Sequence, residues 1–268
     1  MDVSPRLRSA VKLGAALAAS AALAVACSSS KPADRSGTFE GTAQQLGNGQ
    51  VSTFVQLDRD GNPVALGLHL TRAALEGLPT ADPGPHQPLT LELAFPAQAG
   101  ATDFDHVMLN WNAQGHDPMA LFGVPHFDFH FFMIDTAAQQ AIDPADPGFA
   151  TAAANAPAAQ YVPQDYRQVP DSAVPYMGVH WADGSTPLVP GQFQFTRILI
   201  NGSWNGKYTF VEPMVTRDYL LSKPDVSQDV KQPKAFQTSG YFPTHYELRT
   251  GADSYTVALT GLTHHDAS

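Results

Sequence analysis

Residues 125–132 read Pro-His-Phe-Asp-Phe-His-Phe-Phe, a stretch in which titratable and aromatic side chains alternate. Successive side chains of a β-strand point to opposite faces of a sheet. A strand over this stretch therefore places His126, Asp128 and His130 on one face and the intervening phenylalanines on the other. We predict that the phenylalanines face the core, so the row of two imidazoles and a carboxylate requires a separate explanation.

The rest of the chain carries more strand signals than helix signals. Short helices are predicted at 71–77, at 149–156 and at 212–221, the last because Glu212-Pro213 suits a helix start. A long excursion rich in Ala, Pro and Gln covers 135–175. Further strands are predicted at 50–57, 64–70, 87–95, 105–111, 192–200, 207–211, 241–250 and 254–260, with a turn at Asn201-Gly202. This pattern predicts a mainly β fold, an antiparallel β-sandwich or barrel with two or three short helices and one long loop excursion.

The N-terminal 26 residues resemble a bacterial lipoprotein signal peptide. Three basic residues precede an apolar stretch at 13–26, which is shorter than the roughly 20 residues of a membrane-spanning helix. We predict a signal peptide at 1–26, lipidation of Cys27, a flexible tether at 27–37 and a single β-rich domain at 38–268. The protein would be exported and lipid-anchored to the bacterial membrane, in the periplasm or at the cell surface. The alternative is an ordinary secretory signal cleaved near Ala26, which leaves Cys27 as a free thiol.

Composition excludes several classes of protein. Removal of 1–26 takes away three basic residues and one acidic residue, which moves the formal net charge from −10 to −12. An acidic chain without a Lys/Arg cluster argues against nucleic acid as a partner. The sequence has no Gly-x-Ser-x-Gly elbow, phosphate-binding loop or dinucleotide fingerprint, and its single cysteine has no second cysteine with which to form a disulfide. Any catalysis would therefore depend on a metal-bound water or on a His/Asp general base.

Strand geometry limits how the polar row can bind a metal ion. Residues i and i+2 of a strand are about 6.6 Å apart and residues i and i+4 about 13 Å apart, whereas metal–nitrogen bonds are about 2.0–2.1 Å long. His126 and His130 therefore cannot share an ion, but Asp128 can act with either of them, and a third ligand must come from elsewhere. We predict one divalent metal, zinc first, bound by Asp128, His130 and His180. The residues that could complete or support that site are His126, His116 and Glu212.

Each distant candidate also has an ordinary structural explanation. His180 could be a core histidine bonded to the backbone, and His116 a turn residue. Glu212 could complement the dipole of a predicted helix. Together, their occurrence around one aromatic strand favours a shared site.

Several short segments carry a resemblance to a known family. They are 61–63 with 65–67, 74–79, 110–112, Gly115-His116-Asp117-Pro118, the 125–131 strand, Met177-Gly178-Val179-His180-Trp181-Ala182-Asp183, and Glu212-Pro213-Met214-Val215-Thr216. Together they resemble a family of exported bacterial proteins of unknown function, whose known representative is a sigma-E-controlled protein of a thermophilic bacterium. The resemblance spans residues 40 to 260, approximately the whole predicted domain. It implies a β-rich fold and homo-oligomer formation, and it brings no established activity.

Three functions follow from these patterns. The first is an envelope-anchored domain that binds a divalent metal or a small ligand. The second is a metal-dependent hydrolase or lyase, which requires an open coordination position and a cleft covered by 135–175. The third is a structural envelope protein in which His126, Asp128 and His130 form a polar ladder at an oligomer interface.

Overall fold

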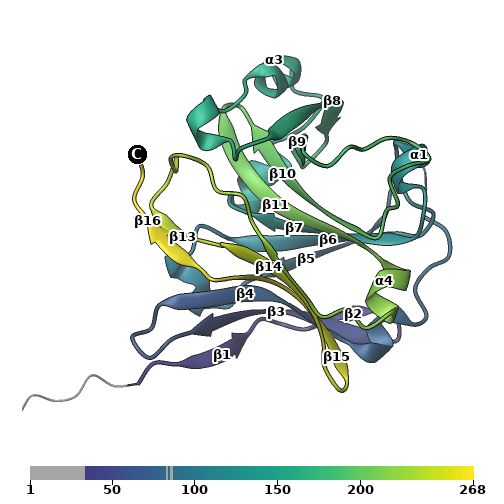
Figure 1. Cartoon of the computed structure of the whole chain (residues 1–268), viewed down its shortest axis with the longest axis vertical. Helices are drawn as coiled ribbons and strands as arrows, with labels where there is room; N and C mark the ends of the chain where they lie inside the picture. The colour runs from purple at the N-terminus through teal and green to yellow at the C-terminus, as the bar shows by residue number, and fades with distance from the viewer. Residues whose placement is uncertain (1–33, 83, 85–86) are drawn as a thin grey trace, which may run out of the picture. The chain divides into compact units, whose positions relative to one another are not determined.

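Two antiparallel sheets form the body of the molecule in the computed structural model, which describes residues 34–82, 84 and 87–268 (Figure 1). The first sheet has the order β1 (Gly37–Glu40), β3 (Gly49–Leu57), β4 (Pro63–Thr71), β15 (Ser254–Thr260), β14 (His245–Thr250) and β12 (Val226–Asp229), with β2 (Gln44–Leu46) paired to β3. The second sheet has the order β5 (Leu89–Ala94), β6 (His106–Asn112), β7 (His126–Phe132), β11 (Lys207–Thr216), β10 (Arg197–Trp204), β9 (Gly178–Asp183) and β8 (Tyr166–Val174). β13 (Gly240–Phe242) and β16 (Thr263–His265) form a separate pair.

Short helices lie in the connections between strands. They are α1 (Met119–Phe122), α2 (Thr136–Gln140), α3 (Phe149–Ala154) and α4 (Arg217–Leu221), with 3-10 turns η1 (Arg72–Leu75), η2 (Ala97–Ala101) and η3 (Ala159–Tyr161). No helix within the described part of the chain is long and apolar enough to span a membrane. The mainly antiparallel, sandwich-like fold predicted from the sequence is confirmed, and the sheets do not close into a barrel.

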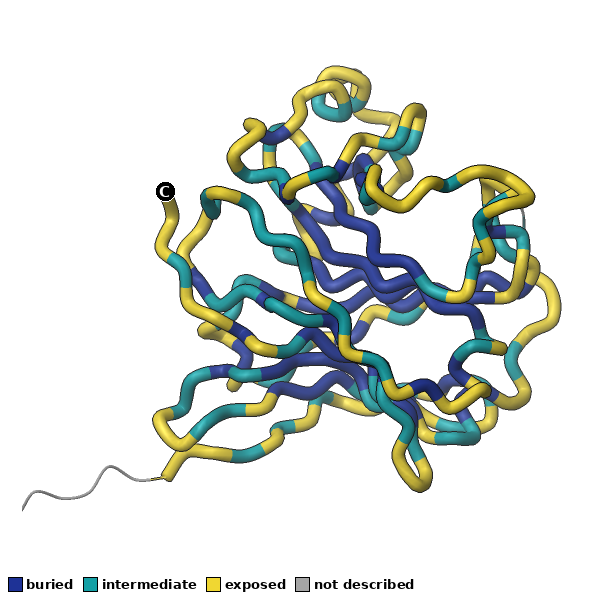
Figure 2. The backbone as a smooth tube through the Cα atoms, viewed as in Figure 1, coloured by how far each residue is buried: buried dark blue, intermediate teal, exposed yellow. Residues whose placement is uncertain are grey.

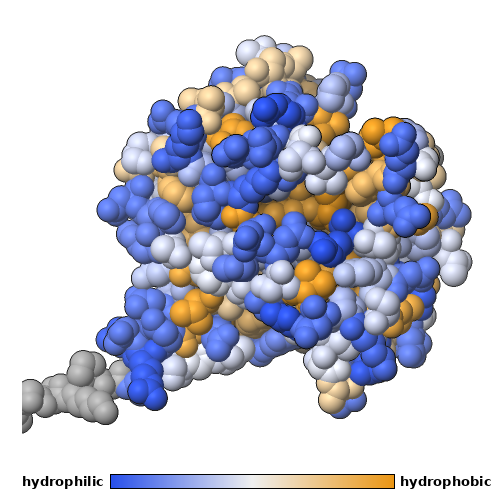
Figure 3. Space-filling model, viewed as in Figure 1, coloured by the Kyte–Doolittle hydropathy of each residue, from blue (hydrophilic) through white to orange (hydrophobic). Residues whose placement is uncertain are grey.

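The main core lies between the two sheets. Its fully buried side chains include Leu66 and Leu68 of β4, Val257 of β15 and three of the four phenylalanines of β7. Figure 2 shows that the buried segments are the central strands of both sheets, with exposure increasing toward the loops. The face of the molecule drawn in Figure 3 is mainly hydrophilic, with scattered hydrophobic patches. Phe127, Phe129 and Phe131 are all fully buried, as the alternation in the sequence predicts.

Some local predictions are wrong, for identifiable reasons. Asn201-Gly202 lies inside β10, and the turn is instead Asn205-Gly206, where both residues have positive φ, as a tight type I′ hairpin requires. Glu212 does not start a helix, because β11 continues to Thr216 and the Thr216 side chain then caps α4 by accepting from the Tyr219 backbone N–H. The excursion at 135–175 includes α3, in agreement with the helix predicted at 149–156, and it also includes α2 and the strand β8, which the sequence did not reveal.

The predicted signal peptide at 1–26 and the lipidation site Cys27 lie outside the described residues, as does most of the predicted tether at 27–37.

Candidate metal centre

The outer surface of the second sheet carries a buried row of polar side chains. We call this surface the polar face, and it includes His126, Asp128 and His130 of β7 together with Glu212 of β11. All four residues are buried although they lie opposite the core side of the sheet. Loops on either side cover them, and the Phe195 ring, for example, packs edge-on against His126 at a centroid distance of 5.0 Å.

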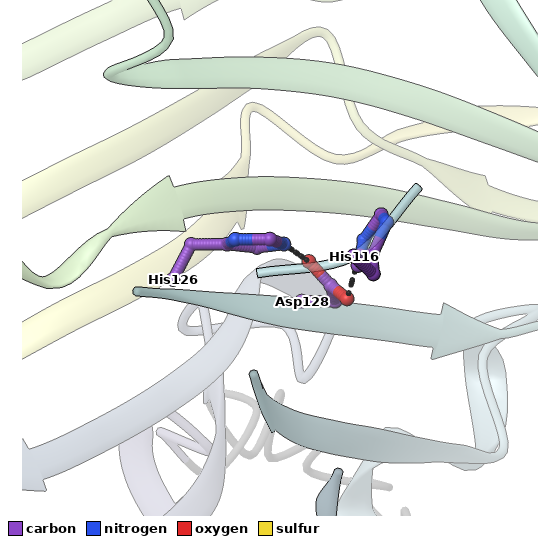
Figure 4. Close-up of side chains that lie close together, drawn as sticks. All are labelled: His116, His126 and Asp128. Atoms are coloured by element: carbon purple, nitrogen blue, oxygen red, sulfur yellow. Dashed lines mark ion pairs between the residues drawn. The ribbon is translucent and has the colours of Figure 1, made fainter. Parts of the chain in front are cut away.

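The first cluster on the polar face joins His126 and Asp128 to His116, which lies in the loop before α1 (Figure 4). Nε2 of His126 lies 3.2 Å from Oδ1 of Asp128, and Nε2 of His116 lies 3.4 Å from Oδ2. Asn112, directly opposite His126 on β6, donates from Nδ2 to Oδ2 of Asp128 at 2.7 Å. The carboxylate is therefore fixed in position with one imidazole beside each oxygen.

The second cluster joins His130 of β7 to Glu212 of β11 and His180 of β9. Nε2 of His130 lies 3.3 Å from Oε1 of Glu212, and Nε2 of His180 lies 3.8 Å from Oε2. The pairing of β11 with β7 is interrupted at this point. Phe210 pairs with Phe132 and Val211 with Phe131, and the pairing resumes only where Met214 lies opposite Asp128. Pro213 has no N–H to donate to the ladder, which accounts for the gap beside His130.

Three of the four histidines are oriented by their second ring nitrogen. Nδ1 of His116 donates to the Asp117 carbonyl at 2.7 Å and Nδ1 of His126 to the Val124 carbonyl at 2.7 Å. Nδ1 of His180 donates to the Ser172 carbonyl at 2.9 Å. A proton on Nδ1 leaves the Nε2 lone pair free and directed at the carboxylate, which is the usual support of a metal-binding histidine.

The clusters contain buried polar atoms without a hydrogen-bond partner. These atoms are His126 Nε2, Asp128 Oδ1, both ring nitrogens of His130, and Glu212 Oε2. The contacts of 3.2 and 3.3 Å bring nitrogen and oxygen together, but they are not aligned as hydrogen bonds. Four ligands held at about 2.0–2.1 Å around a tetrahedral ion are separated from one another by about 3.3 Å. The ligand atoms of each cluster lie within 4.8 Å of one another, so a small shift would place them around an ion.

Burial and charge set the protonation of the two clusters in opposite ways. Burial opposes ionisation of Asp128, but His126 and His116 outweigh it and hold the pKa of Asp128 well below its ordinary value. Burial also opposes the charged form of His116, yet Asp128 and the Asp117 carbonyl raise its pKa. In the second cluster, burial and the negative charge of Asp128 raise the pKa of Glu212 well above its ordinary value. Burial lowers the pKa of His130 to about 3 and also lowers the pKa of His180.

Without a bound ion, these shifts favour an ion pair in the first cluster and a neutral carboxylic acid beside neutral imidazoles in the second. Neutral imidazole is the form that binds metals.

A hollow of about 370 Å³ opens beside the first cluster. Its lining includes His116 and Asn112 together with Asp82 and Met119. The described residues that form the hollow come from the 112–119 region and from Asp82, Gly84, Gln87 and Pro88. None comes from 135–175, the segment expected to cover an active-site cleft.

The six residues predicted as ligands all gather at the polar face, but in two groups. Asp128 is in one cluster while His130 and His180 are in the other, so that predicted trio does not surround a single point. His126 and His130 also separate into different clusters, in agreement with the strand-geometry argument. Binding of a metal itself remains a prediction.

Two residues that support the clusters were not identified as site residues from the sequence. Asn112 shares the polar face because it alternates with the core residue Trp111 on β6, a signal that the sequence does contain. Gly202 is directly opposite His180 on β10, where the absence of a side chain leaves room for the Phe210 ring. That ring is fully buried and packs edge-on against His130 at 5.0 Å and His180 at 5.3 Å.

Gly202→Ala is expected to disturb the second cluster. A Cβ at this position would overlap the Phe210 ring, which has no room to move without displacing His130 or His180. Overpacking of this kind costs about 1–3 kcal/mol. Urea unfolding should show that loss, and zinc titration should show weaker binding at one site. Gly100→Ala, where nothing lies within 4 Å of the new Cβ, is the matched control. Equal behaviour of the two variants would contradict the proposed role of Gly202.

Fold and site together define a β-sandwich protein with two buried clusters of potential metal ligands. A family model described as TTHB210-like, hypothetical protein TTHB210, matches residues 58–111, from the turn before β4 to the end of β6. Over that stretch the chain is similar to a family of uncharacterised proteins. The six candidate ligands lie outside the matched stretch. No curated protein and no solved structure matches the chain.

Proposed function

We propose that this protein is an exported, lipid-anchored domain that binds divalent metal ions at the polar face. One ion is held by His116, His126 and Asp128, and a second by His130, His180 and Glu212. The lipid anchor is Cys27, and this part of the proposal is supported by the basic and apolar segments that precede it in the sequence.

The observation that carries the proposal is the set of buried ligand atoms without hydrogen-bond partners. Leaving a buried polar group unsatisfied costs about 1–3 kcal/mol, so a face designed only for stability would be apolar or fully hydrogen-bonded. Here the unpartnered atoms face one another within each cluster, and the histidines beside them are fixed through Nδ1. A cation in each cluster would satisfy these atoms, with the exception of Nδ1 of His130, because an imidazole directs only one of its ring nitrogens at an ion.

The ligand chemistry favours zinc first. Two imidazoles and one carboxylate form a common three-ligand set for zinc, with a fourth position left for water. The same set with open positions also suits non-haem iron(II). The absence of thiolate from both clusters argues against copper(I) and iron–sulfur chemistry.

Metal analysis of the purified, untagged protein tests the proposal. We expect up to two equivalents of zinc per chain by plasma mass spectrometry, or uptake of two equivalents by the chelator-treated protein in calorimetric titration. Anaerobic titration with iron(II) measures its affinity for the same sites and shows which of the two metals binds more tightly.

The double variant His264→Ala/His265→Ala is the control for metal binding at the protein surface. It removes two partly exposed histidines near the C-terminus and should leave the number of bound zinc ions unchanged. No metal after mild purification, together with no uptake on titration, would refute the proposal. The polar ladder at an oligomer interface would then be the better explanation.

The hollow beside His116 favours a metal-dependent hydrolase as the second candidate function. His116 is 30% exposed, whereas the other two ligands of the first cluster are buried, so this ion would be the one that a substrate could reach. A zinc-bound water beside this hollow could attack an ester or amide. Zinc-dependent turnover of activated esters that is lost in His116→Ala would distinguish this function from metal binding alone.

A further inference from the structure

A second hollow, of about 390 Å³, lies on the core side of the second sheet, away from the polar face. Strands β10 and β11 contribute to its lining, along with the 103–104, 133–134 and 161–163 segments and the 230–243 segment. This volume is within the range of small-molecule sites, which measure about 300–1,000 Å³.

The walls of this hollow are largely apolar. The apolar side chains include Phe104, Met133, Val211, Phe236 and Phe242. Phe236 and Phe242 contact each other with centroids 4.5 Å apart, so they form a joined aromatic wall. Such a surface favours an apolar ligand body, since burial of apolar area contributes about 25 cal/mol per Å².

Two of the polar side chains that line the hollow come from the neighbouring strands β10 and β11. Asn201 pairs with Val211 across β10 and β11, so both face the core side of the sheet. A bulge then shifts the register, so that Ser203 pairs with Tyr208. Bulges re-aim side chains, and this one directs Tyr208 into the same hollow as Asn201 and Val211.

Both polar side chains have unpartnered atoms. Oδ1 of Asn201 and the hydroxyl of Tyr208 are buried without a hydrogen-bond partner, and Asn201 is only 2% exposed. Burial keeps the Tyr208 hydroxyl protonated by raising its pKa well above the ordinary value. The nearby hydroxyl of Tyr166 already donates to the Leu199 carbonyl at 3.3 Å. The largely apolar lining of the hollow therefore includes an amide and a phenol hydroxyl.

The charged groups around this hollow are paired or solvated. Lys231 contacts Asp165 and Asp183, each at 2.9 Å. Asp103 accepts a hydrogen bond from Thr238 at 2.6 Å, and Lys207 is solvent-exposed. Among the described lining residues, no buried charge remains for a charged ligand to neutralise.

We propose that this hollow is a binding site for an uncharged, mainly apolar small molecule that ends in a hydroxyl group. A hydroxyl both donates and accepts, so it can satisfy the Asn201 amide and the Tyr208 hydroxyl together. The apolar body of the ligand occupies the chamber lined by Phe104, Phe236 and Phe242. The site is independent of metal binding at the polar face.

A matched pair of probes tests the proposal on the full chain. 2-Naphthol carries the hydroxyl, naphthalene lacks it, and both are fluorescent, so titration of the protein into either probe reports binding. We expect 2-naphthol to bind at least about tenfold more tightly than naphthalene, which corresponds to about 1.4 kcal/mol. Tyr208→Phe removes the hydroxyl and keeps the ring, and it should remove most of that preference while leaving naphthalene binding unchanged. Ala235→Trp, which fills the chamber, should weaken binding of both probes.

Absence of 2-naphthol binding below 1 mM would overturn the proposal, as would equal binding of the two probes or a preference unchanged in Tyr208→Phe. The two unpartnered groups would then hold ordered water only. If the variants fail to fold, anomalous scattering from 6-bromo-2-naphthol soaked into crystals of the unmodified protein locates the probe directly. Bromine density in this hollow, with the hydroxyl at Asn201, supports the site, and density elsewhere or none overturns it.

Discussion

Asp128→Asn is expected to destabilise the metal-free protein by about 3–5 kcal/mol, the usual cost of removing one partner from a buried ion pair. The Asp128 carboxylate is buried between His126 and His116 and accepts from Asn112 at 2.7 Å. The substitution removes the carboxylate that raises the pKa of His116. It also places the new side-chain amide at position 128 against the side-chain amide of Asn112. Urea unfolding of the chelator-treated protein measures the loss.

The pH dependence of the same experiment has a defined sign. The folded-state pKa of Asp128 is depressed below its ordinary value of 3.8. Its contribution is therefore present above that value and is lost as the pH falls through the folded-state pKa. The pKa of His116 is raised from 6.5, so its contribution is complete below that value and is lost as the pH rises through its folded-state pKa. The stability difference between the unmodified protein and Asp128→Asn should be largest between these limits.

Asp105→Asn is the matched control for this prediction. Asp105 also lies beside a buried histidine, with Oδ1 2.9 Å from Nδ1 of His106, but its side chain is 50% exposed. Exposed pairs contribute about 0–1 kcal/mol, so this variant should be nearly as stable as the unmodified protein. If Asp128→Asn were equally mild, the buried ion pair would not exist in the metal-free state.

Local sequence patterns predicted the parts of this molecule that depend on short spacings. The alternation over 125–132 correctly placed Phe127, Phe129 and Phe131 in the core, because side-chain period is a property of a single strand. The same alternation explains why His126 and His130 separate into two clusters. What it could not supply is the register between strands, which sets Asn112 opposite His126 and Gly202 opposite His180.

Glu212 shows how tertiary structure overrides a local signal. Pro at the first helical position is typical of a helix start, yet β11 runs through Pro213 between β7 and β10. Pro213 interrupts the pairing of β11 with β7 only locally, and on the other side of β11 it still pairs with Leu199 of β10. The strand therefore carries Glu212 onto the polar face beside His130, a position that the predicted helix would not have given it.

Zinc is expected to raise the stability of the metal-free protein by about 4 kcal/mol per site when free zinc exceeds the dissociation constant about a thousandfold. For a domain of this size, that corresponds to about 10 °C in the thermal midpoint for each site. The metal must displace the proton of Glu212, whose pKa is raised by burial and by Asp128. Zinc uptake at the second cluster should therefore release protons, which a titration in buffers of different ionisation enthalpy detects.

Glu212→Gln separates the metal contribution from the packing contribution. Glutamine has the shape and neutrality of the protonated glutamic acid, so the metal-free variant should be as stable as the unmodified protein, in contrast to Asp128→Asn. Loss of an outer-shell partner alone weakens metal binding 10–100-fold, so loss of this ligand should weaken the second site by at least about a hundredfold. The variant would then bind one equivalent of zinc and retain about half of the thermal shift, while the exposed Glu76→Gln control keeps both. Two equivalents in Glu212→Gln would show that the second ion lies elsewhere. Strong destabilisation of the metal-free variant would instead show that Glu212 is ionised within the fold and forms a salt bridge with His130.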